Sequence, residues 1–274
     1  VMRRSLSITV YRRILIAAAF LVMMVISIYQ YSWFLFAYAL QQNLNWNLAE
    51  IGLTFTVFAY AATFVQPFSG YLADSQGPAK IATGAACLTG AGFMLASTAS
   101  SPPVLYAYYG LGGLGVGVLY GISTACAVKW FPNRRGFATG WVVFGFGAGT
   151  AVFNHFIQRL LQAQGPGPTF FWIGFVMILV LVPLSLLFRY PEEGAATDAS
   201  GENRHVPASR AYRPLQMLST YQWFLIYFCF TATVSIVLMF GAQMKILAKA
   251  FDVPEHYFNL LLVLFPLGNG FSRV

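Results

Sequence analysis

The stretch YGLGGLGVGVLYG, residues 109–121, decides how this chain folds. It contains the spacing Gly-x-Gly-x-x-Gly, which is typical of a loop that binds a dinucleotide. Such a loop follows a strand, opens a helix and is followed about 20 residues later by an acid that holds the ribose. Here residues 103–128 form one uninterrupted apolar segment, and no acid occurs between Asp74 and Glu192. The sequence therefore predicts no dinucleotide, and we expect no cofactor.

The same glycines predict close packing between helices. On a helix, Gly110, Gly113, Gly117 and Gly121 follow spacings of three and four residues, so they share one face. Small residues on one face let a neighbouring backbone approach closely, as is common between membrane helices. The stretch is therefore interpreted as the packing face of a membrane helix.

The composition of the whole chain is that of a membrane protein. Of its 274 residues 58% are hydrophobic and 9% are charged, and the mean hydropathy is +0.65. A water-soluble domain of this composition would expose large apolar patches. We therefore expect an all-α polytopic membrane protein. Its net charge is +8, but we expect the lipid bilayer, and not nucleic acid, as its partner.

Eight apolar runs are long enough, at about 18 residues or more, to cross a hydrocarbon core of about 30 Å. The first follows four arginines but is longer than the apolar part of a secretory signal. A polar connection over 191–216 predicts three parts: a six-helix bundle over 1–190, a cytoplasmic linker, and the start of a second bundle over 217–274. Because the last run has no polar exit, we expect the chain to be cut there. The predicted spans are 14–40, 50–72, 81–99, 103–128, 137–162, 168–190, 217–244 and 257–274.

The distribution of charge predicts the topology. Most of the 16 lysines and arginines precede the first span or lie in the loops between spans 2 and 3, spans 4 and 5, and spans 6 and 7. Because basic loops stay in the cytoplasm, we expect a cytoplasmic N-terminus. We also expect the protein to be a monomer in the plasma (inner) membrane. Three cysteines, Cys87, Cys126 and Cys229, fall inside predicted spans and are interpreted as small core residues, with no disulfide and no metal site.

Residues 70–80, GYLADSQGPAK, resemble the cytoplasmic loop motif of the major facilitator superfamily: a glycine, an acid and a glycine followed by basic residues. Ser75 stands where that family usually has Lys or Arg. Asp74 is then expected to pair with basic groups on the neighbouring bundle when the cytoplasmic side is shut, and the alternative is an ordinary helix cap. The matching residues are Gly70, Asp74, Gly77 and Lys80.

Further segments resemble the oxalate/formate antiporter family within that superfamily. Residues 129–140, KWFPNRRGFATG, resemble its loop between helices 4 and 5, with Arg134 and Arg135 as the basic pair. The resemblance implies two six-helix bundles that rock about a central site near the membrane midplane. This chain would hold the first bundle and the first two helices of the second. The other similar segments are Gln30–Trp33, Gly115–Gly121 and Asn269–Arg273.

The resemblance also implies the binding residues. In that family an arginine of helix 8 and a lysine of helix 11 hold a dicarboxylate, and aromatic residues wall the cavity. Arg273 matches the arginine, and Tyr31 and Tyr120 match two aromatic positions, for which cavity wall and core are equally open. Phe146 stands where the family can carry a tyrosine. The lysine lies beyond this sequence. Flanking candidates are Trp33 and Gln30.

Arg273 carries the one charge that we find well inside a predicted span. Burying it costs at least about 2.5 to 3.5 kcal/mol on insertion scales, so a function for the charge is expected. A guanidinium grips a carboxylate through two parallel hydrogen bonds. The alternative is an arginine that extends to a nearby interface.

Four functions fit the sequence. The leading one is a secondary carrier that exchanges small carboxylate anions such as oxalate and formate. Proton-coupled monocarboxylate symport is the alternative, but related carriers place an acid where this chain has Asn269. A membrane enzyme such as an acyltransferase would need an acid to orient a base such as His155, and no acid occurs in that part of the sequence. His155 is interpreted as a buried neutral histidine or, alternatively, as a proton relay. A transporter-like sensor stays open.

Overall fold

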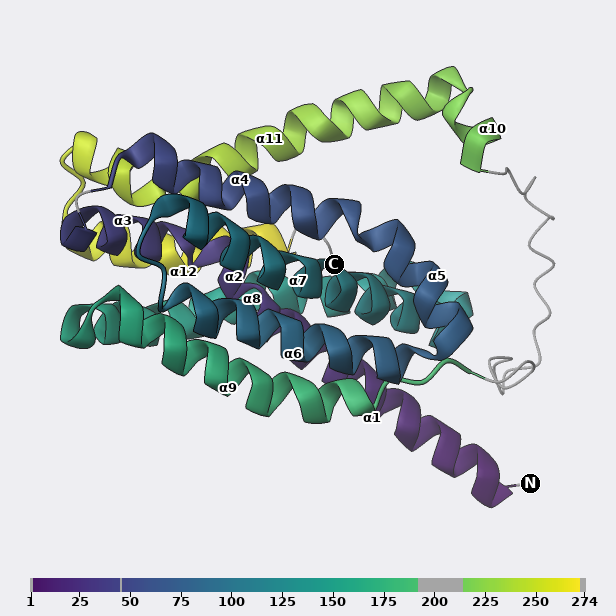
Figure 1. Cartoon of the computed structure of the whole chain (residues 1–274). Helices are drawn as coiled ribbons and strands as arrows, with labels where there is room; N and C mark the ends of the chain where they lie inside the picture. The colour runs from purple at the N-terminus through teal and green to yellow at the C-terminus, as the bar shows by residue number, and fades with distance from the viewer. Residues whose placement is uncertain (1, 45, 192–213, 272–274) are drawn as a thin grey trace.

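The computed structural model describes residues 2–44, 46–191 and 214–271, and every regular element in those ranges is a helix. The helices lie side by side along one common direction, and successive connections alternate between the two ends of the bundle (Figure 1). The all-α class is therefore confirmed. The elements are α1 (Met2–Ile26), α2 (Ile28–Tyr31), α3 (Trp33–Leu44), α4 (Leu48–Phe64), α5 (Gln66–Gln76), α6 (Pro78–Ala96), α7 (Pro102–Trp130), η1 (Pro132–Arg134), α8 (Arg135–Gln164), α9 (Pro166–Leu186), α10 (Pro214–Leu218), α11 (Tyr221–Ala250) and α12 (Glu255–Phe271).

Five helical segments are long and apolar enough to cross a membrane, and six if the bent pair α4 and α5 counts as one span. They coincide, within a few residues, with the first six predicted spans. The pair bends by 41° between Phe64 and Gln66. The last two predicted spans correspond to α11 and α12, whose apolar stretches, Tyr221–Ile236 and His256–Phe265, are shorter among the described residues. The predicted linker lies largely at 192–213, outside the described residues.

The first span is broken twice, at Ser27 and at Ser32, and the four-residue α2 lies between the breaks. Ser27 Oγ donates to the carbonyl oxygen of Met24 at 2.6 Å, and Ser32 Oγ donates to Asn154 Oδ1 of α8 at 2.7 Å. A serine hydroxyl that bonds to a carbonyl of its own helix, as Ser27 does, competes with the regular helical hydrogen bonds, whereas Ser32 bonds to another helix. Tyr31 and Trp33 stand on either side of the second break, and residues two apart on a helix point to opposite sides.

The glycines of α7 pack it against α4 and α5, as predicted. At Gly117 an added Cβ would collide with the carbonyl oxygen of Ala62, so the two backbones touch directly. A second face of α7 approaches α6, where a Cβ on Gly115 would meet the carbonyl oxygen of Ala85 at 2.5 Å. The predicted face, Gly110, Gly113, Gly117 and Gly121, would meet Val57, Phe58, Ala62 and Ser69 in that order.

Two predictions about element ends and cores were wrong. The helix of the seventh predicted span does not end at 244: α11 continues to Ala250, and Lys249 lies in its last turn. A cation is favourable there because of the helix dipole, and its Nζ lies 5.9 Å from the centre of the Tyr38 ring. Of the three cysteines only Cys126 is buried, because Cys87 and Cys229 lie on outward faces of their helices.

Candidate functional site

An aromatic cluster forms where α2, α7 and α8 meet. The ring of Phe146 lies 5.5 Å from that of Tyr31 and 5.4 Å from that of Tyr120, edge-on to each. Tyr31 and Phe146 are buried, at 6% and 4% exposure, whereas Tyr120 is half-buried. The structure thus brings together the two tyrosines that the sequence singled out, around the phenylalanine that replaces a third. We call these three residues the central aromatic cluster.

The end of α12 approaches α8 at the level of this cluster. Phe271 of α12 lies with its ring 4.8 Å from that of Phe144. Phe144 and Phe146 differ by about 3 Å along the axis of α8, so α12 reaches the height of the central aromatic cluster. Arg273 follows two residues later and lies outside the described residues. Of Asn269 and Gly270 only the helical backbone is described.

Trp33 and Gln30 are placed differently from the cluster. Trp33 is 1% exposed and its ring lies 4.7 Å from that of Tyr109, inside the aromatic core between α3 and α7. Gln30 is half-buried on α2, next to Tyr31. The structure therefore keeps Gln30 beside the cluster and directs Trp33 into the packed core.

One buried polar pair was not identified from the sequence as a site. Asn154 of α8 is 1% exposed and accepts the hydrogen bond of Ser32, while its Nδ2 has no hydrogen-bond partner among the described residues. A buried amide that is half satisfied costs free energy, so its position is strongly determined by its one partner. The sequence feature that could have indicated this pair is Asn154 itself, a single asparagine in an apolar span. The adjacent His155, interpreted as buried, is exposed, because Asn154 and not His155 faces the bundle.

The basic end of the bundle carries the loop motif. Asp74, near the end of α5, forms a 2.5 Å ion pair with Lys129 in the last turn of α7, and Lys129 also lies 3.6 Å from the centre of the Tyr190 ring. The two ionic side chains are 61% and 39% exposed, so solvent screens them. Burial raises the pKa of Tyr190 above its ordinary value, with smaller contributions from Cys126 and Asp74.

The remaining residues of the motif have backbone or surface roles. Gly77 caps α5 with φ 90°, a conformation that favours glycine, and its N–H donates a hydrogen bond to the carbonyl oxygen of Ala73. Lys80, Arg134 and Arg135 are exposed, and Arg135 Nε donates to the carbonyl oxygen of Pro132 at 3.1 Å. Gly70 is half-buried with open space where a Cβ would stand. The acid of the motif thus pairs with Lys129 of the same bundle, and not with a basic group of the second bundle as expected, and no described helix-end amide is capped by it.

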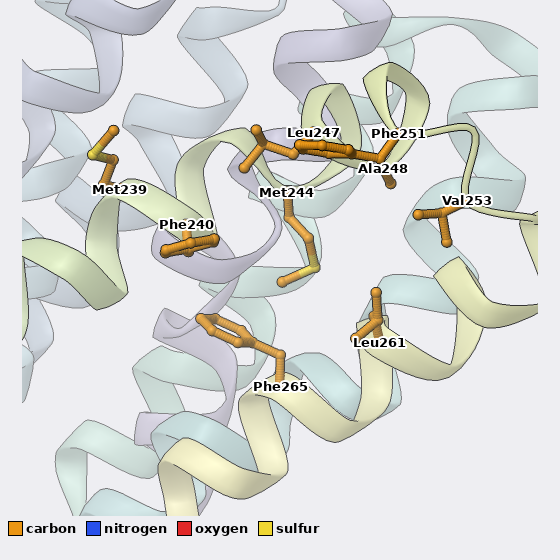
Figure 2. A pocket seen from close by; sticks show the side chains of 9 residues that line it. All are labelled: Met239, Phe240, Met244, Leu247, Ala248, Phe251, Val253, Leu261 and Phe265. Carbon is orange, nitrogen blue, oxygen red and sulfur yellow. The ribbon is translucent and has the colours of Figure 1, made fainter.

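A large hollow between α11 and α12 does not suit an anion. Its volume is about 520 Å³, and Figure 2 shows its side chains converging from the two helices and their connection. All nine lining residues are apolar, so no side-chain donor could compensate for the desolvation of a carboxylate. Within the described ranges no three His, Cys, Asp or Glu side chains gather closely enough to hold a metal ion.

Comparisons with known proteins agree with this architecture. A family model described as Major Facilitator Superfamily matches residues 15–274. The chain is 32% identical over 212 residues to an oxalate:formate antiporter of Oxalobacter formigenes, covering 77% of this chain and 50% of that protein. It is 41% identical over 176 residues to an uncharacterized 38 kDa protein in a 23S RNA operon of Thermoproteus tenax, covering 64% and 46%.

The fold also has a solved counterpart. The xylose transporter XylE from E. coli, in an inward open conformation, matches with a TM-score of 0.53 and 17% identity, over 66% of this chain and 50% of that one. At that identity the likeness concerns the fold alone. The chain spans about half the length of the curated relatives it matches.

Proposed function

Because the chain belongs to the Major Facilitator Superfamily, we propose that the protein is a secondary active transporter that exchanges small carboxylate anions of the oxalate/formate type by alternating access. The superfamily consists of transporters and not of enzymes, which excludes the acyltransferase hypothesis. The similarity to an oxalate:formate antiporter supports this substrate class.

The observation that carries the proposal is the central aromatic cluster. Tyr31 and Tyr120 come from different spans and meet at Phe146, at the height where α12 reaches α8. Phenol rings offer a flat apolar face and a hydroxyl donor, which suits a small planar anion. In the proposed site the two hydroxyls donate to carboxylate oxygens, and Phe146 supplies an apolar wall on the side of α8.

Arg273 is the proposed cation of the site. Two residues after Phe271, it follows the part of α12 that lies against α8. A guanidinium in a dry cavity binds a carboxylate through two parallel hydrogen bonds and offsets the cost of desolvating the anion. Gln30 offers a further amide beside Tyr31, whereas Trp33 would support the first span by packing against Tyr109.

Proton-coupled monocarboxylate symport is the alternative within the same family. A symporter needs a group that takes up a proton with the substrate, and related carriers use an acid one turn before the arginine. Asn269 stands there and cannot ionise. Exchange, in which one anion leaves as another enters, requires no such group.

Counterflow tests the proposal and separates it from the alternative. The full-length protein, reconstituted in vesicles loaded with unlabelled formate or oxalate, should take up labelled oxalate, and a proton ionophore should leave the rate unchanged. Uptake that collapses with the pH gradient would favour symport. Oxalate binding without any flux would favour a sensor.

A further inference from the structure

A second hollow opens on the outside of the bundle, between α1, α8 and α9. Its volume is about 350 Å³, at the small end of the range of about 300 to 1,000 Å³ for ligand sites. It is bounded by residues 21–25 of α1 with Ile28 of α2, 153–160 of α8 and 172–180 of α9, and every lining residue is apolar. We call it the outer groove.

The outer groove has a closed floor and an open mouth. Met177 and Ile157 of its floor are 1% and 3% exposed, whereas Phe156 and Trp172 at its mouth are 59% and 52% exposed. All three helices belong to segments that are long and apolar enough to cross a membrane. The mouth therefore opens toward the hydrocarbon of the bilayer and not toward a neighbouring described helix.

The outer groove has the length of one leaflet. Along each of the three spans its lining rises by about 10 to 12 Å, compared with about 15 Å for half of a hydrocarbon core. It starts about 6 to 9 Å from the connection between α8 and α9 and, on α9, reaches past the middle of the helix to Val180. An extended acyl chain that enters from the interface at that connection would fit along it.

A cation lies beside the mouth at the depth of a lipid headgroup. Arg159 is exposed on α8, one residue before Leu160 and three after Phe156, both of which line the groove. It lies about 8 Å from the end of α8, and Trp172 lies about 9 Å from the start of α9, so the two side chains share a depth. No described carboxylate forms an ion pair with Arg159. Tryptophan and arginine together are typical of a membrane interface.

We propose that the outer groove binds one acyl chain of an anionic phospholipid, whose phosphate is held by Arg159. The chain would lie on the apolar floor, and the guanidinium would donate charge-assisted hydrogen bonds to the phosphate oxygens. A carboxylate substrate does not suit this groove, because its lining offers no polar side chain. The inference concerns the outer surface and is independent of the proposed transport activity.

Quenching of tryptophan fluorescence by brominated lipids tests this site. The full-length protein is reconstituted in vesicles that contain dibrominated phosphatidylglycerol or dibrominated phosphatidylcholine at equal fractions. The contribution of Trp172 is the quenching that Trp172→Phe removes. We expect Trp172 to prefer phosphatidylglycerol about fivefold, as follows from about 1 kcal/mol per basic residue near a surface, and Arg159→Gln to abolish the preference.

Trp141 is the matched control, because it is 42% exposed on the same helix but does not line the groove. Its quenching should not respond to Arg159→Gln. Val176→Phe should fill the mouth and reduce quenching at Trp172, while unchanged quenching at Trp141 reports that the bundle is intact. Equal quenching of Trp172 by both lipids, unaffected by Arg159→Gln, would reduce the site to ordinary boundary lipid and overturn the proposal. Absence of quenching of Trp172 by either lipid would also overturn the proposal, because no acyl chain would then lie in the outer groove.

Discussion

At the scale of single residues, the buried contact between Ser32 and Asn154 ties the broken first span to α8. Both side chains are almost fully buried, at 0% and 1% exposure, and the 2.7 Å hydrogen bond joins residues 122 positions apart. Ser32 adjoins Tyr31, and Asn154 lies two turns of α8 beyond Phe146. The contact therefore fixes the relative position of two members of the central aromatic cluster.

Removing both partners of this hydrogen bond should cost little more than removing one. We expect Ser32→Ala to lower the free energy of unfolding by about 1 to 3 kcal/mol, because Asn154 would keep a desolvated carbonyl without a donor. Adding Asn154→Leu should cost little more. Unfolding in detergent, followed by circular dichroism, measures each variant.

Thr56→Ala serves as the control for this cycle. Thr56 is exposed and its hydroxyl makes only a long 3.4 Å bond to Gly52, so the change should stay within about 0.5 kcal/mol. Effects of the Ser32 and Asn154 substitutions that simply add in the double variant would contradict the coupling.

The ion pair between Asp74 and Lys129 should contribute little to stability. Because both side chains are substantially exposed, we expect Asp74→Asn to change the free energy of unfolding by less than about 1 kcal/mol. The same detergent unfolding measurement applies, with Lys129→Gln as the matched variant. A loss of several kcal/mol in either would mean that the pair is far better shielded than its exposure indicates.

At the scale of helices, backbone contact between α4 and α7 depends on glycine. We expect Gly117→Val to prevent close packing, because its Cβ would overlap the carbonyl oxygen of Ala62, which cannot move without shifting α4. The cost should exceed about 3 kcal/mol, or the protein should fail to accumulate in the membrane.

Gly52→Ala is the matched control for the packing of α4. Gly52 lies on α4 itself with open space around its Cβ position, so alanine should be neutral or stabilise by up to about 1 kcal/mol. Yield in membranes and detergent unfolding measure both variants. Normal stability of Gly117→Val would show that the two helices do not pack in backbone contact.

The packing face of α7 could be predicted because glycines at spacings of three and four in an apolar run place a strip of bare backbone on one side of a helix. The ends of α9 and α11 could not. A hydropathy window follows composition, whereas Lys249 continues α11 as a favourable C-terminal cation and α9 ends at Leu186 although apolar residues follow. The breaks at Ser27 and Ser32 were also missed. The hydrogen bond of Ser27 is local, to the carbonyl of Met24, whereas that of Ser32 to Asn154 joins two distant segments and depends on tertiary structure.

The candidate site could be predicted only in part. Tyr31, Tyr120 and Phe146 were found by resemblance and do meet around one ring. Trp33 was grouped with them because it flanks Tyr31 in the similar segment, although residues two apart on a helix point about 200° away from each other. Lys129, which pairs with Asp74, stands a few residues before the two arginines of the loop motif.

At the scale of the whole molecule, the basic residues predict which end faces the cytoplasm. The start of α1, the α5–α6 turn and the segment around η1 lie at one end of the bundle (Figure 1). In a protein without its native cysteines, Asn133→Cys should react with an impermeant maleimide only after the membrane is opened. Ser100→Cys, at the other end, should react in intact cells. The reverse pattern would invert the topology.

The central claim is the proposal that Arg273, two residues beyond the end of α12, binds a carboxylate together with the central aromatic cluster. The most direct measurement is labelled oxalate counterflow by full-length Arg273→Gln in vesicles, beside Lys249→Gln, which removes a cation at the far end of α11. We predict that Arg273→Gln loses at least about a hundredfold in rate, consistent with the loss of about 3 kcal/mol from a charged pair, while Lys249→Gln transports normally. Oxalate counterflow at the parent rate in Arg273→Gln would contradict the account.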